Sequence, residues 1–121
     1  MKPFLVDVPV LILFFNRPQQ LSQVFEQVRN ARPSKLFLYQ DGPRSEHDLP
    51  GIKACREVTD QIDWDCEVHR MYQEKNYGCD PSEYISQKWA FSMVDTCIVL
   101  EDDDVPSVSF FTFCKEMLDK Y

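Results

Sequence analysis

Short apolar runs alternate along this chain with longer segments whose apolar residues recur every three or four positions. The run at 9–15, PVLILFF, is apolar throughout, which is typical of a strand that is covered on both faces. Two further apolar runs, at 35–40 and 96–101, have the same character. The segment 64–72 alternates apolar and polar residues, as a half-buried strand does. Four strands are therefore predicted.

The segments between and after these runs carry the spacing of amphipathic helices. They are 18–31, 51–62, 80–94, and a last segment that begins at Ser107 or Ser109 and reaches Tyr121. Asp80, Pro81 and Glu83 have the pattern of a helix N-cap, a first helical residue and a capping-box partner. Alternating strands and helices predict an α/β fold with a mainly parallel sheet, helices on both faces and a Rossmann-like arrangement. We expect residues 1–121 to form a single domain.

Charge, apolar runs and cysteine spacing narrow the kinds of partner and the cellular location that this chain can have. The net charge of −7 disfavours binding to nucleic acid or to an anionic membrane surface. No apolar run reaches the length of a membrane span, and the N-terminal run lacks the cleavage site of a signal peptide. The five cysteines are odd in number and include no CxxC pair, so neither a local zinc site nor a disulfide framework is predicted. These features favour the cytoplasm.

Polar clusters fall where the predicted strands end or in the loops that follow. They are NRP at 16–18, QDG at 40–42, NYG at 76–78 and EDDD at 101–104. In parallel α/β sheets, ligands bind beyond the carboxyl ends of the strands. The position of these clusters therefore predicts a binding site at that edge.

The acidic run is the most informative cluster. Two like charges ~5 Å apart repel by roughly 3 kcal/mol at an effective dielectric constant near 20. Four consecutive carboxylates must therefore either point into water or surround a cation. A strand end with an acid-x-acid spacing suits Mn²⁺ or Mg²⁺, which commonly accepts one or two protein carboxylates together with substrate phosphates. The alternative is a solvated acidic turn that stabilises the N-terminus of the next helix.

The other clusters each allow two interpretations. Arg17 can contact a phosphate or a base, whereas Asn16 can bind a ligand or cap the next helix. Asp41 can accept a hydrogen bond from a base N–H, or stabilise a turn before Gly42. Gly78 can allow close backbone approach to an anion at the start of the next helix, or simply belong to a loop.

Taken together, these motifs resemble the nucleotide-sugar-binding half of a GT-A glycosyltransferase, in particular the N-acetylglucosaminyltransferase I group. The resemblance covers nearly the whole chain and rests on PVLILFFNRP, LFLYQDGP, NYG before QKWAF, and CIVLEDDDVPSVSFFTF. It implies that Asn16 and Arg17 contact the nucleotide and that Asp41 binds the uracil. It also implies that Glu101 and Asp102 bind sugar and ribose hydroxyls, and that Asp103 binds the metal in a DXD-like motif.

The resemblance implies a metal-dependent transferase that moves a sugar from a nucleotide diphosphate sugar, with a UDP-sugar favoured, to an unknown glycan or lipid acceptor. In that family the acceptor-binding part and the catalytic base lie later in the chain. We therefore expect residues 1–121 to be part of a longer enzyme or a stand-alone donor-binding domain, and to be weakly active or inactive alone. An apolar face left uncovered by truncation would favour self-association. A histidine that contacts the nucleotide in the family has no counterpart in NYGCDPSE.

Three alternatives remain at this point. A non-catalytic nucleotide-binding or interaction module would have the same fold. A phosphoacceptor receiver domain would need acids directly after the first strand, where this chain has Asn16 and Arg17. A metal-dependent phosphatase or nuclease would need His or Lys near the carboxylates, and none is near in sequence.

Overall fold

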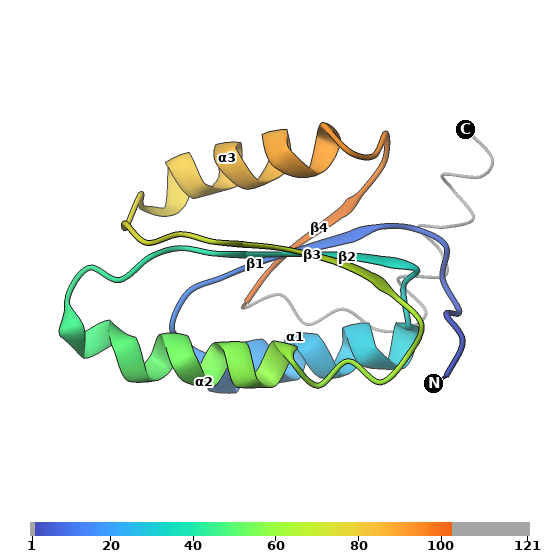
Figure 1. The fold of residues 1–121 in the computed structure, drawn as a ribbon, viewed down its shortest axis with the longest axis horizontal. Coiled ribbons are helices and arrows are strands. Elements are labelled where there is room, and N and C mark those ends of the chain that lie inside the picture. The colour runs from blue at the N-terminus through green and yellow to red at the C-terminus, as the bar shows by residue number, and fades with distance from the viewer. Residues whose placement is uncertain (1, 103–121) are drawn as a thin grey trace.

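Four parallel strands form one sheet in the computed structural model, which describes residues 2–102 (Figure 1). The strands are β1 (Val10–Phe14), β2 (Lys35–Gln40), β3 (Glu67–Tyr72) and β4 (Ile98–Glu101). Their order in the sheet is β3-β2-β1-β4, and every pairing is parallel. The predicted α/β fold with a parallel sheet is therefore confirmed.

Helices cover both faces of the sheet, as predicted. Helices α1 (Pro18–Ala31) and α2 (Leu49–Thr59) lie on one face, whereas α3 (Cys79–Phe91) lies on the other (Figure 1). A short 3₁₀ turn, η1 (Glu46–Asp48), precedes α2. The chain runs outward from β1 to β3 along one face and returns over the other face to β4, beside β1. The topological switch point therefore lies between β1 and β4, where open α/β sheets bind ligands.

Strand β1 is the centre of the core, and all five of its residues are buried. Val10, Ile12 and Phe14 belong to the apolar cluster that includes residues of α1 and α2. Leu11 and Leu13 belong to the cluster on the α3 side. This alternation of faces explains why the run is apolar at every position.

Helix α3 packs on the sheet through small residues. Its buried positions are Ser82, Ser86 and Ala90, which recur every four residues along one side of the helix. The Tyr39 hydroxyl of β2 donates a hydrogen bond of 3.1 Å to Ser82 Oγ. Small side chains let the helix axis approach the sheet, and Trp89 then packs edge-on against Phe37, with ring centroids 5.3 Å apart.

Several predicted boundaries differ from the structure. Helix α2 begins and ends two to three residues earlier than the predicted 51–62, and α3 ends at Phe91 rather than near 94. The predicted N-cap at Asp80 is wrong, because α3 begins at Cys79 with Gly78 as its N-cap and no side-chain capping bond. The last predicted helix lies outside the described residues. Between residues 2 and 102, no helix has the length and apolar character to cross a membrane.

Candidate functional site

A cleft of about 250 Å³ lies at the carboxyl edge of the sheet, at the switch point. Three of the residues predicted from sequence to form the site line it: Asp41, Glu101 and Asp102. Its other walls come from β1, β2 and the first turn of α3, and they include Leu13, Phe14, Tyr39, Gly78, Cys79, Ser82 and Glu83. The cleft thus combines an apolar floor from the strand ends with carboxylates from two strand ends.

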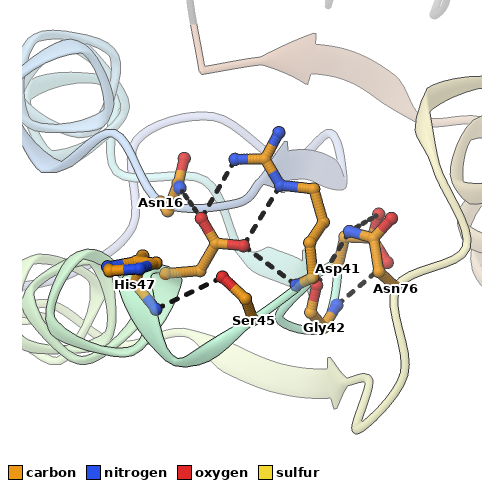
Figure 2. A network of polar contacts seen from close by, with 8 residues as sticks. Asn16, Asp41, Gly42, Ser45, His47 and Asn76 are labelled. Atoms are coloured by element: carbon orange, nitrogen blue, oxygen red, sulfur yellow. Dashed lines mark hydrogen bonds and ion pairs between the residues drawn. The ribbon is translucent and has the colours of Figure 1, made fainter.

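Asp41 organises one wall of this cleft. Its side chain is buried, and its two carboxylate oxygens accept four hydrogen bonds from the surrounding loops. Figure 2 shows Asp41 beside Asn76 and Gly42. Oδ1 accepts from the backbone N–H groups of Gly42 and Tyr77, both at 2.9 Å. Oδ2 accepts from the backbone N–H of Gly78 at 3.0 Å and from Asn76 Nδ2 at 3.1 Å. These four donors occupy the acceptor sites that a carboxylate offers.

This contact explains how α3 begins. Gly78 has φ +85° and ψ 174°, a backbone conformation that only glycine adopts readily. Its N–H and that of Tyr77 donate to Asp41 from the neighbouring strand end, which fixes the backbone directly before the helix. Gly78 and Cys79 at the N-terminal end of α3 therefore line the cleft, with the Asp41 carboxylate bound to the N–H of Gly78.

A second polar network lies beside the cleft and holds Asn16. Asn16 Nδ2 donates to Asp48 Oδ1 at 2.7 Å, and Asp48 also accepts from the backbone N–H and guanidinium of Arg44 (Figure 2). Arg44 holds the pKa of the Asp48 carboxyl well below its usual range, chiefly through these hydrogen bonds. Asn16 does not line the cleft and does not cap α1, because its side chain ties the end of β1 to η1.

Arg17 is exposed at the N-cap position of α1 and does not line the cleft. Within residues 2–102 it forms no ion pair.

Cys55 on α2 is buried, and burial raises the pKa of its thiol to about 12, with a further contribution from the negative charge of Asp102. A buried thiol with a raised pKa stays protonated near neutral pH, which disfavours reaction as a nucleophile.

The predicted metal ligand, Asp103, lies outside the described residues. Among residues 2–102, no group of three or more His, Cys, Asp or Glu side chains is placed to hold a metal ion. Glu101 and Asp102 both line the cleft, and no such group of three includes them among the described residues.

Sequence analysis missed several residues of the site. Tyr39 and Ser82 line the cleft, yet their pattern indicates only a buried strand and a helix. Glu83 also lines it, although the sequence suggested a capping role. Asp48 sits in a polar loop in the sequence, and no local signal marks it as buried and paired.

No known protein-family model matches this chain, and no curated protein has a significantly similar sequence.

Proposed function

We propose that this chain is the donor-binding part of a glycosyltransferase and that the cleft binds the nucleotide diphosphate sugar. One observation carries the proposal: the cleft lies at the switch point of a parallel sheet and is lined by Asp41, Glu101 and Asp102. This is the place where open α/β sheets bind nucleotides. The cleft volume of about 250 Å³ lies just below the range of about 300–1,000 Å³ that is usual for small-molecule sites.

Each wall of the cleft has a role in this proposal. Leu13, Phe14 and Tyr39 offer apolar contact to a flat base or to the face of a sugar ring. Glu101 and Asp102 accept hydrogen bonds from sugar and ribose hydroxyls. The N-terminal turn of α3, which Asp41 fixes, faces the diphosphate.

Charge makes a cation necessary for tight binding. A diphosphate that enters a cleft lined by Glu101 and Asp102 is repelled by them, and the whole chain carries a net charge of −7. Mn²⁺ or Mg²⁺ would neutralise part of that charge, and Asp103 is the ligand that the family resemblance implies for it. No catalytic base is assigned within this chain, so we expect it to bind the nucleotide sugar without efficient sugar transfer. We further propose that the protein acts in the cytoplasm.

Isothermal titration calorimetry tests the proposal. UDP, GDP, CDP and UDP-N-acetylglucosamine are titrated with Mn²⁺ or Mg²⁺ and again with EDTA. We expect a UDP compound to bind best and the affinity to fall at least tenfold without the metal. Glu101→Gln and Asp102→Asn should each weaken binding by fivefold or more, whereas Glu57→Gln, an exposed carboxylate on α2, should not. The proposal fails if no nucleotide binds, or if both cleft variants bind as the unmodified chain does.

A further inference from the structure

A second concave surface lies on the opposite side of the sheet from the cleft. It is a groove of about 600 Å³ between α2 and the segments that follow β2 and β3. Figure 1 shows α2 on the face opposite α3, so the sheet separates the groove from the cleft. The residues that give the groove its chemistry are Leu49, Ile52, Lys53, Arg56, Tyr72 and Glu74.

Arg56 is held in a fixed position in this groove. Its Nε–H donates to Gln40 Oε1 at 2.8 Å, and Gln40 is completely buried. The Gln40 amide is itself fixed, because Nε2 donates to the backbone carbonyls of Phe15 at 2.8 Å and Ile52 at 3.1 Å. The guanidinium carbon of Arg56 lies 4.5 Å from the centre of the Tyr72 ring. Hydrogen bonding and stacking thus orient the guanidinium before any ligand arrives.

Arg56 has no ion-pair partner among residues 2–102. Lys53 likewise forms no ion pair within the described part of the chain. Lys53 lies three residues before Arg56 on α2, so both cations lie on the same side of the helix and line the same groove. Two unpaired cations in one groove are unexpected in a chain with a net charge of −7.

The rest of the lining suits an organic body attached to an anion. Leu49 is 49% exposed and lies beside the buried Ile52, which gives the groove an apolar strip. The Tyr72 hydroxyl is buried and has no hydrogen-bond partner among residues 2–102. Glu74, which is exposed, is the acidic residue of the lining, so the two cations leave the groove with an excess of positive charge.

We propose that this groove is a binding site for a small organic anion, with a carboxylate or phosphate group bound by Arg56 and Lys53 and an apolar body lying against Leu49 and Ile52. Arg56 supplies the planar Nη donors that match two oxygens of the anion, and Lys53 supplies a second positive charge. The site is independent of the cleft, so it stands whether or not the cleft binds a nucleotide sugar.

Nuclear magnetic resonance titration of the ¹⁵N-labelled chain tests this site. The probes are phenyl phosphate, benzoate and the uncharged control phenol. We expect phenyl phosphate and benzoate to shift the amide signals of residues 49–56 and 72–74, and phenol to bind at least tenfold more weakly. Lys53→Gln, a change at an exposed position, should weaken binding of both anions by fivefold or more. Lys88→Gln, an exposed lysine on α3, should leave it within twofold.

Arg56→Lys separates fixed geometry from charge alone. It keeps the positive charge but removes the guanidinium that bonds to Gln40, so binding should fall by fivefold or more. The site is refuted if the shifts map to α3 and the cleft instead, if phenol binds as well as phenyl phosphate, or if Lys53→Gln leaves the affinity unchanged.

Discussion

Replacing Asp41 by Asn tests whether this buried carboxylate holds the cleft together. Asn has the same shape but only one acceptor oxygen. If that oxygen takes the place of Oδ1, the hydrogen bonds from Gly42 and Tyr77 remain. The new NH₂ group then faces two donors, the N–H of Gly78 and Nδ2 of Asn76. The Gly78 N–H loses its partner, and Asn76 cannot turn its amide to accept from the new NH₂ group without losing its own 2.9 Å bond to the carbonyl of Gly42.

The cost follows from these contacts. An unpaired buried N–H costs about 1–3 kcal/mol, and a bond to a charged acceptor is stronger than one to a neutral acceptor by about 1 kcal/mol. For Asp41→Asn we therefore expect a loss of about 3 kcal/mol in the free energy of unfolding. A domain has only about 5–15 kcal/mol in total, so this is a large fraction. With a urea slope near 1.5 kcal/mol/M, the midpoint should fall by about 2 M.

Urea unfolding followed by tryptophan fluorescence measures this loss, because Trp64 is completely buried. Asp65→Asn is the matched control, since Asp65 is exposed, and it should change stability by less than about 0.5 kcal/mol. Amide hydrogen exchange adds a local test: the Gly78 amide should exchange faster in Asp41→Asn, because it has lost its acceptor. The reasoning is refuted if Asp41→Asn and Asp65→Asn unfold at the same urea concentration.

Three further predictions concern stability. Tyr72→Phe removes a buried hydroxyl that has no partner among residues 2–102, so we expect the free energy of unfolding to rise by about 1 kcal/mol in urea titrations; a loss of stability would contradict this. Gly78→Ala forces a side chain onto φ +85°, so it should cost about 1–3 kcal/mol, even though open space surrounds the new methyl group; an unchanged urea midpoint would be the contrary result. Asp48→Asn should lower the melting temperature at pH 7. Because Arg44 lowers the pKa of Asp48 in the folded state, the stabilisation is present above the unfolded-state pKa of about 3.9 and is lost as the pH falls below it. The gap between the melting temperatures of the unmodified chain and Asp48→Asn should therefore narrow steadily as the pH falls below about 4. A gap that stayed constant with pH would refute this cause.

The strand and helix pattern could be predicted because it depends on local periodicity. The fully apolar run of β1 indicated a strand covered on both faces, and that is what the structure contains. The location of the cleft at the carboxyl edge of the sheet could also be predicted. Glu101 ends its strand, Asp41 and Asp102 directly follow theirs, and these strands are parallel in the structure.

The start of α3 could not be predicted from its own sequence. Asp80 and Pro81 have a good local capping pattern, but the acceptor for Gly78 comes from Asp41, 37 residues earlier. Likewise, Asn16 was interpreted as a cap or ligand, and its partner Asp48 lies 32 residues away. Such pairings depend on which loops meet at the sheet edge, and a single sequence does not specify that.

Gln40 and Asp41, two neighbouring residues at the end of β2, each hold a different surface of the protein in place. Gln40 bonds to Ile52 and Arg56 on the α2 side, and Asp41 bonds to the loop before α3 on the other side. Side chains of an extended chain point alternately to opposite sides, so one dipeptide anchors two surfaces. An insertion, deletion or backbone shift at residues 40–41 therefore alters the groove beside α2 and the cleft beside α3 together. A change at this strand end cannot alter one of them and leave the other unchanged.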